Sequence, residues 1–128
     1  MTLQEAILTL IPYLTDRKFN AFRVEHSINC VAMTCTAWDG ERPVGIAFLH
    51  DLHRPWKSEG RIEDVVVHPE FRGKGIGRGL IEQLIGHARR NEYELLSLTS
   101  SPKREAANHL YTNLGFERYE TNVYRLKL

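Results

Sequence analysis

The chain has 128 residues, 42% of them hydrophobic and 26% charged, and its formal net charge is +1. This length suits one domain with its own core and is too short for two, so we expect a single domain over residues 1–128. The composition indicates a soluble globular protein, and so small a net charge excludes a general electrostatic attraction to nucleic acid or to an anionic membrane. With no apolar run long enough to span a membrane and no signal-peptide pattern at the start, we expect a cytoplasmic protein.

Hydrophobic periodicity and turn signals predict a mixed α/β chain. The first part is predicted to contain a helix over Leu3–Leu14, a short helix around Phe22–Glu25, and strands over Cys30–Trp38 and Pro43–Leu49. The second part is predicted to contain a strand over Ile62–Val67, a helix over Gly75–Asn91, a strand over Glu94–Thr99, a helix over Lys103–Leu114, and strands over Glu117–Tyr119 and Asn122–Leu128. Asp39-Gly40 indicates a hairpin with a loop of about four residues, and His50–Gly60 is a predicted polar loop. We expect helices on both faces of the sheet.

The segment after the strand over Ile62–Val67 has the features of an anion-binding site. The strand ends at His68-Pro69, because proline cannot donate to a sheet ladder, and a glycine-rich turn then leads into an amphipathic helix. Glycines let the backbone approach a ligand closely, the first N–H groups of the helix point at it, and the helix dipole favours negative charge. Three cationic side chains in the turn suit a pyrophosphate. The turn consists of Arg72, Gly73, Lys74, Gly75, Ile76, Gly77 and Arg78.

The spacing of these glycines distinguishes between the known nucleotide-binding turns. The dinucleotide pattern G-x-G-x-x-G fails in every frame, and the P-loop pattern fails because Gly73-Lys74 is followed by Gly75. The pattern Arg-x-x-Gly-x-Gly from Arg72 to Gly77 does fit, and it resembles the acyl-CoA-binding signature of the GNAT superfamily of N-acetyltransferases. A second segment, Glu105–Phe116, resembles the later A-x-x-L-Y-x-x-x-G-F motif of the same superfamily.

This resemblance implies a fold and a set of cofactor contacts. The fold would be a single-domain α/β GNAT-like fold with a mixed central sheet, in which the strands over Ile62–Val67 and Glu94–Thr99 are parallel and splay apart at the cofactor. Acetyl-CoA would serve as co-substrate, with its pyrophosphate on the glycine-rich turn. The backbones of Val65, Val66 and Val67 would bind the pantetheine, and Arg104 and Ala107 would lie beside the cofactor. Arg104 stands where the superfamily often has an asparagine.

Two acidic residues and one tyrosine are the candidates for proton transfer. Glu63 and Asp64 precede the valines, and because successive strand residues point to opposite faces, one of them must face the cofactor side. The strand is similar to that of spermidine/spermine and glucosamine-phosphate N-acetyltransferases, which implies a base or amine anchor at Glu63, with Asp64 as the rival. Tyr111 lies on a helical stripe that a core aromatic would also occupy. The resemblance implies that it is the general acid toward the leaving thiolate.

The sequence predicts an N-acetyltransferase that transfers the acetyl group of acetyl-CoA to a primary amine of a small molecule, by direct attack in a ternary complex. A protein or peptide N-acetyltransferase and a non-catalytic acyl-CoA-binding regulatory module are the alternatives. Glu63 and Asp64 favour a cationic amine, whereas His53, Arg54 and Arg104 would equally suit an acidic acceptor. Trp56 is a candidate wall of the acceptor site. No metal is expected, because His50 and His53 fit no ligand pattern, and a homodimer is left open.

Overall fold

The computed structural model describes residues 2–15 and 30–128. Its elements are α1 (Leu3–Leu10), the 3-10 helix η1 (Ile11–Tyr13), β1 (Met33–Asp39), β2 (Arg42–Asp51), β3 (Glu59–Val67), the 3-10 helix η2 (Pro69–Phe71), α3 (Ile76–Arg90), β4 (Leu95–Ser97) and α4 (Glu105–Asn113). The helix expected around Phe22–Glu25 lies outside the described residues. The other elements expected as far as α4 are present with shifted ends; β3 starts at Glu59, so part of the predicted polar loop is strand.

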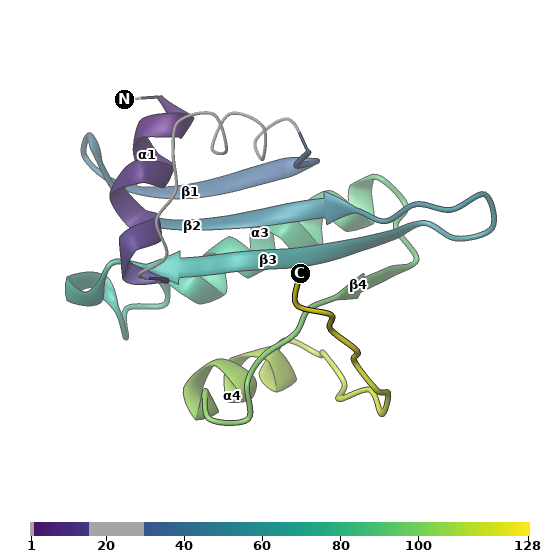
Figure 1. Ribbon diagram of the computed structural model, residues 1–128. Helices are drawn as coiled ribbons and strands as arrows, with labels where there is room; N and C mark the ends of the chain where they lie inside the picture. The colour runs from purple at the N-terminus through teal and green to yellow at the C-terminus, as the bar shows by residue number, and fades with distance from the viewer. Residues whose placement is uncertain (1, 16–29) are drawn as a thin grey trace.

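The four strands form one mixed sheet in the order β1-β2-β3-β4. The first three are antiparallel, while β3 and β4 are parallel and are connected through α3. Figure 1 shows α1 on one face of the sheet and α3 on the other. The predicted α/β class, with a mixed sheet and helices on both faces, is therefore confirmed.

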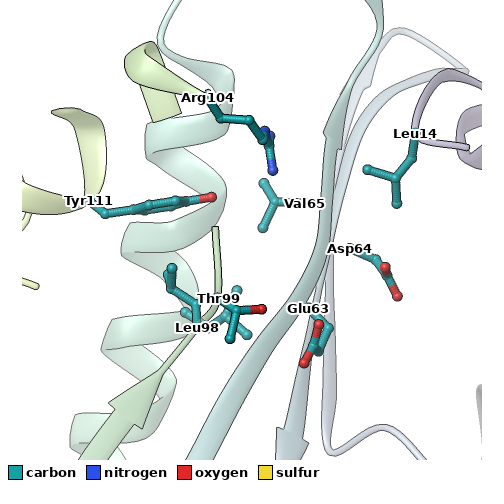
Figure 2. A pocket seen from close by; sticks show the side chains of 9 residues that line it. Leu14, Glu63, Asp64, Val65, Leu98, Thr99, Arg104 and Tyr111 are labelled. Carbon is teal, nitrogen blue, oxygen red and sulfur yellow. The ribbon is translucent and has the colours of Figure 1, made fainter. Parts of the chain in front are cut away.

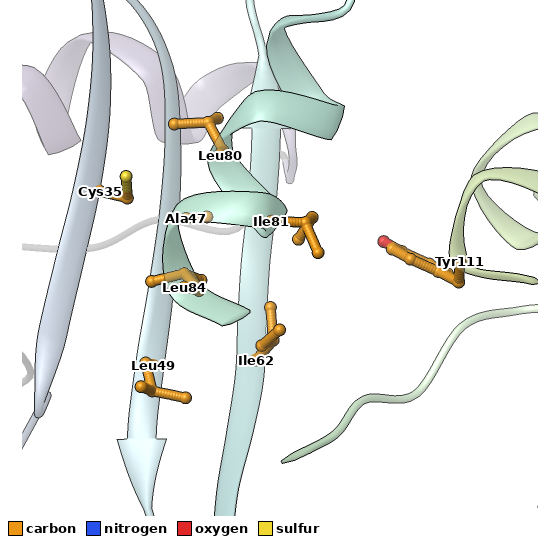
Figure 3. Close-up of a cluster of buried hydrophobic side chains, with 8 residues drawn as sticks. All are labelled: Cys35, Ala47, Leu49, Ile62, Leu80, Ile81, Leu84 and Tyr111. Carbon is orange, nitrogen blue, oxygen red and sulfur yellow. The ribbon is translucent and has the colours of Figure 1, made fainter. Parts of the chain in front are cut away.

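Each face of the sheet has its own apolar core. The helix α1 buries Ile7 and Leu10 against β2 and β3. On the opposite face, α3 buries a larger cluster, to which α4 contributes one aromatic ring (Figure 3). This cluster consists of Cys35, Ala47, Leu49, Ile62, Leu80, Ile81, Leu84 and Tyr111. Because residues of one strand alternate between the two cores, the side-chain direction along β3 is fixed by burial on both faces.

The hairpin between β1 and β2 is tighter than the sequence predicted. Asp39 pairs with Arg42, which leaves Gly40 and Glu41 as the loop, so the expectation of a four-residue loop is wrong. Gly40 adopts a φ of 61°, and this left-handed conformation lets two residues reverse the chain. The Asp-Gly pair was thus a sufficient turn signal, and Arg42 belongs to the strand.

The two strands predicted at the C-terminus are also wrong. Residues 117–128 contain no helix or strand in the described structure, although Tyr124–Leu128 alternates between apolar and polar residues. Tyr119 and Tyr124 are 85% and 87% exposed, so neither face of this segment is buried. An alternating segment forms a strand only where a neighbouring strand can pair with it and a core can bury one of its faces. The last strand of the sheet, β4, is only three residues long, so it offers little edge for pairing. In the described part of the chain, no helix is long and apolar enough to cross a membrane.

The strand β3 contains a bulge opposite β2. Val66 pairs with Ile46 and Glu63 pairs with Phe48, so Asp64 and Val65 together face the single residue Ala47. Asp64 adopts a left-handed φ of 55°, a conformation that aspartate tolerates better than most residues. The bulge therefore changes which way the acidic side chains point.

Gly60 lies where β3 and β4 meet, and its lack of a side chain allows their contact. A Cβ atom at this position would lie 2.8 Å from Tyr93 Cε2 and 2.9 Å from Leu49 Cδ1. We expect Gly60→Ala to lower the free energy of unfolding in urea by about 1–3 kcal/mol, because the core must shift to accept the methyl group. The control is Gly79→Ala in α3, where a Cβ meets nothing within 4 Å. That variant should keep its stability or gain up to about 1 kcal/mol. Equal stability of the two variants would contradict the packing argument.

Candidate active site

A pocket opens where β3 and β4 separate. The two strands pair only at Glu59–Leu95, Gly60–Leu96 and Arg61–Ser97, and the pocket of about 160 Å³ begins at the next residues (Figure 2). Its lining residues are Leu14, Ile62, Glu63, Asp64, Val65, Leu98, Thr99, Arg104 and Tyr111. The strands thus splay apart beyond their paired ends, as the resemblance implied. We call this pocket the slot.

The bulge in β3 sets the direction of the side chains in the slot. Val65 points toward Arg104 and Tyr111, whereas Asp64 lies on the other side of β3, where Leu14 also lies (Figure 2). Glu63 also lies on the side of the slot away from Arg104 and Tyr111. The expectation that one acidic residue of the pair must face the cofactor side assumed strict alternation. The extra residue of the bulge interrupts that alternation, and neither carboxylate lies beside Tyr111.

Tyr111 serves the core with its ring and the slot with its hydroxyl. The side chain is 8% exposed, and its ring stacks edge-on against Phe116 with centroids 6.0 Å apart. Figure 2 shows the hydroxyl directed into the slot. Burial raises the pKa of Tyr111 above that of a free tyrosine, while the positive charge of Arg104 acts in the opposite direction. Tyr111 therefore packs in the α3 core and also lines the slot.

Arg104 reaches the slot from the start of α4. It is the N-cap residue of that helix, and its backbone N–H donates to Ser101 O at 3.0 Å. In Figure 2 its side chain extends toward Val65, above the Tyr111 hydroxyl. Ala107 lies one turn further along α4, where it packs partly buried against the core and does not line the slot.

The glycine-rich turn lies at the carboxyl end of β3 and leads directly into α3. Gly73 and Gly75 adopt φ values of 76° and 81°, and a Cβ on either would meet nothing within 4 Å. Gly75 is the N-cap of α3, so the first N–H groups of that helix are presented at the turn. An open, left-handed backbone at a helix N-terminus is suited to an anion.

The cationic side chains of this turn have different surroundings. Arg72 Nε donates to Val67 O at 3.0 Å, which ties the turn to the end of β3. Arg78 Nε donates to Glu82 Oε1 at 2.8 Å, and Lys74 Nζ lies 5.1 Å from the centroid of the Phe71 ring. Lys74 is therefore the cation of the three that the described structure leaves without a hydrogen bond or ion pair.

The loop between β2 and β3 lies outside the slot. Trp56 is 76% exposed and does not line the slot, so the structure does not bring it to Glu63 or Tyr111. The basic side chains of this loop have local partners: Arg54 contacts Glu59 at 2.6 Å, and His53 contacts Asp51 at 3.4 Å. In residues 2–15 and 30–128, no group of three or more His, Cys, Asp or Glu side chains is placed to hold a metal ion.

Sequence reasoning missed four residues of the slot, one of which is Ile62 on β3. Leu98 and Thr99 line it because they follow the last paired residue of β4, Ser97. The predicted splay of two parallel strands was the signal that could have found them. Leu14 lines it from the C-cap of η1, on the α1 side of the sheet. Nothing in the sequence around Leu14 indicates that contact.

Comparison with known proteins gives a consistent picture. A family model described as the acetyltransferase (GNAT) family matches residues 5–116. Glucosamine 6-phosphate N-acetyltransferase of Trypanosoma brucei brucei is 39% identical over 70 residues, which are 55% of this chain and 46% of that protein. Mycothiol acetyltransferase of Propionibacterium freudenreichii subsp. shermanii is 33% identical over 80 residues, which are 62% of this chain and 26% of that protein. This chain thus spans less than half the length of either relative.

The fold has a clear counterpart among solved structures. The crystal structure of a Trypanosoma brucei acetyltransferase superposes with a TM-score of 0.80 at 29% identity, covering 98% of this chain and 92% of that one. The slot, the bulge and the glycine-rich turn therefore occur in a chain whose whole architecture matches a solved acetyltransferase.

Gly75 provides a test of the anion site. We expect Gly75→Val to weaken acetyl-CoA binding by roughly 10-fold or more in calorimetry, because a β-branched residue resists a left-handed φ and crowds the helix N-terminus. Gly40→Val is the matched control, since Gly40 has a φ of 61° with nothing within 4 Å of its Cβ and lies on the β1–β2 hairpin. The control should cost similar stability and keep its affinity. Unchanged affinity in a folded Gly75→Val variant would remove the anion-site assignment.

Proposed function

We propose that this chain, which belongs to the GNAT acetyltransferase family, transfers the acetyl group of acetyl-CoA to a primary amine of a small molecule by direct attack in a ternary complex. The observation that carries this proposal is the slot, whose lining comes from both sides of the sheet. Leu14 and Asp64 lie on one side of β3, and Tyr111 lies on the other. Such an opening suits an acceptor and a donor that approach each other from opposite sides, and positioning alone supplies much of the rate of such a reaction.

The residues around the turn and the slot fit acetyl-CoA. The open φ-positive backbone at Gly73 and Gly75 suits the pyrophosphate, and Ile76, Gly77 and the three cations of the turn complete that cradle. Past Arg61 the edge of β3 has no β4 partner. We propose that the backbone groups of Val65–Val67 bind the pantetheine there as a neighbouring strand would. Arg104 and Ala107 would lie on the α4 side of the bound cofactor. When bound, acetyl-CoA supplies an acetyl thioester that an amine can attack.

Proton transfer is assigned to two side chains on opposite sides of the slot. Glu63 accepts the proton that the amine nitrogen loses, and 37% of its side chain is exposed in the slot. Tyr111 presents its hydroxyl where sulfur leaves, and acts as the hydrogen-bond and proton donor. A module that only binds acyl-CoA would need neither side chain in the slot. Their joint presence there supports an enzyme.

The distribution of charge favours a cationic acceptor. His53 and Arg54, which could have served an acidic acceptor, are paired with Asp51 and Glu59 on the distant loop. Arg104 lies across the slot from the two carboxylates. Among the described residues that line the slot, Glu63 and Asp64 are the charged ones on the side that Leu14 borders, and Glu63 also lies 3.9 Å from Arg61. We propose that the acceptor is an amine that carries a further positive charge, with Asp64 as its anchor.

Tyr111→Phe separates an enzyme from a binding module. Removing the hydroxyl should lower kcat by roughly 10²–10⁴-fold, because a positioned proton donor is lost. The ring keeps its core contacts, so stability and acetyl-CoA affinity should change little. Tyr119→Phe is the control, since Tyr119 is 85% exposed and lies outside the slot. Wild-type turnover in Tyr111→Phe would reduce this tyrosine to a packing role.

Three acceptors of similar length test the charge assignment. Putrescine, butylamine and γ-aminobutyrate place a cation, a methyl group or a carboxylate at the far end from the reacting amine. We expect kcat/KM to fall in that order. Asp64→Asn should lower the ratio of kcat/KM for putrescine to that for butylamine by roughly 10-fold, since a charge-assisted contact is lost. Asparagine tolerates a left-handed φ, so the bulge should persist.

Glu41→Gln on the exposed β1–β2 loop is the control for the loss of one negative charge. A preference for γ-aminobutyrate would overturn the cationic assignment. Acetylation of a lysine-containing peptide in preference to all three amines would favour the protein acetyltransferase alternative.

A further inference from the structure

Arg104 has a fixed backbone and a guanidinium that no described residue neutralises. The Arg104 carbonyl accepts from Asn108 N at 2.9 Å, and Asn108 Nδ2 donates to Ser101 O at 2.9 Å. Asn108 therefore links the first turn of α4 to the residues that precede it. The Arg104 side chain forms no hydrogen bond or ion pair with residues 2–15 or 30–128. Arg54 and Arg78, by contrast, each contact a glutamate within 3 Å.

The slot concentrates positive potential at the point where Arg104 and Tyr111 converge. Arg104 is the N-cap of α4, so the positive end of the helix dipole adds to its charge. Burial raises the pKa of Tyr111, and the charge of Arg104, acting through space, opposes that rise. The other ionised side chains that line the slot, Glu63 and Asp64, lie on the opposite side.

In the proposed reaction, the departing CoA thiolate is the anion that forms beside Arg104 and Tyr111. The nitrogen of the neutral amine bonds to the acetyl carbon, the carbon–sulfur bond breaks, and its electron pair goes to sulfur. The nitrogen's proton passes to Glu63, and the thiolate is afterwards protonated from Tyr111, which recovers its proton from water. A phenol of pKa about 10 gives a proton to a thiolate of pKa about 8.5 with an equilibrium unfavourable by roughly 30-fold. Burial raises the pKa of Tyr111 and makes that transfer harder.

We propose that Arg104 is a catalytic residue that pairs with the departing CoA thiolate as the carbon–sulfur bond breaks. This inference rests on the proposed function and assigns Arg104 a role at sulfur, in place of a contact with the pantetheine or the pyrophosphate. A cation there stabilises the developing thiolate together with the hydrogen bond from Tyr111, so both side chains contribute to the departure of sulfur. The interaction forms only as charge develops on sulfur, and it therefore acts on the transition state.

The bound product reports this pairing without turnover. The thiolate of CoA absorbs in the ultraviolet, and the complex with desulfo-CoA is a blank that cancels absorbance from tyrosines. We expect the pKa of the CoA thiol in the wild-type complex to lie about one unit or more below that of free CoA, since a nearby cation favours the thiolate. Glu63 and Asp64 would shift it the opposite way, so they cannot imitate the result.

Variants at Arg104 assign the shift to this side chain. Arg104→Gln should return the thiol pKa to the free value or above it, and Arg104→Lys should retain most of the shift. Lys103→Gln, which removes a neighbouring exposed cation outside the slot, should leave the shift intact. Arg104→Gln should also bind desulfo-CoA as tightly as the wild type does, because the pyrophosphate and pantetheine are unchanged.

The outcomes separate this proposal from the function it rests on. A wild-type complex with an unshifted thiol pKa would overturn the role of Arg104 and leave acetyl transfer standing. An equal loss of affinity for CoA and desulfo-CoA in Arg104→Gln would overturn it in favour of a pantetheine or pyrophosphate contact. A wild-type protein that binds neither molecule would overturn both the proposed function and this inference.

Discussion

The short pairing of β3 with β4 is the constraint on which the site depends. The two strands share three residue pairs and then separate, and the side chains beyond that point line the slot. Gly60 permits the close contact at the paired end, where Tyr93 and Leu49 would collide with any Cβ. Had the strands paired along their whole length, the backbone edge of Val65–Val67 would be occupied by β4. A ligand could then not use it as a strand.

The bulge at Asp64 determines what each side of that slot contains. Burial fixes Ile62 and Val65 toward the α3 core and Val66 toward the α1 core. Two residues must therefore fit between Ile62 and Val65, and the left-handed φ at Asp64 accommodates the extra one. A left-handed aspartate costs some free energy, which the cores on both faces offset. The result is an acidic side of the slot that is separate from the side of Tyr111.

The cationic side chains near the sheet differ in whether they have a local partner. Most cations near the sheet have local partners: Arg54 with Glu59, Arg72 with the end of β3, and Arg78 with Glu82. Arg104 differs, because it lies in a pocket without such a partner among the described residues. An unpaired guanidinium beside a buried phenol suits a site where negative charge appears transiently. A cation that is already paired with a carboxylate, as Arg54 and Arg78 are, would stabilise such a transient charge little.

The sequence by itself determined most of the helices and strands as far as α4, including the glycine-rich turn and the helix that carries Tyr111. These depend on local chemistry: glycines that adopt positive φ, a proline that ends a strand, and apolar residues at helical spacing. The tertiary structure decided the rest. It placed Trp56 away from the slot, left Asn122–Leu128 without a strand partner, and put both Glu63 and Asp64 away from Tyr111, where alternation had predicted one of them. Those outcomes depend on pairing register and on burial by segments distant in the sequence, which no local pattern of residues contains.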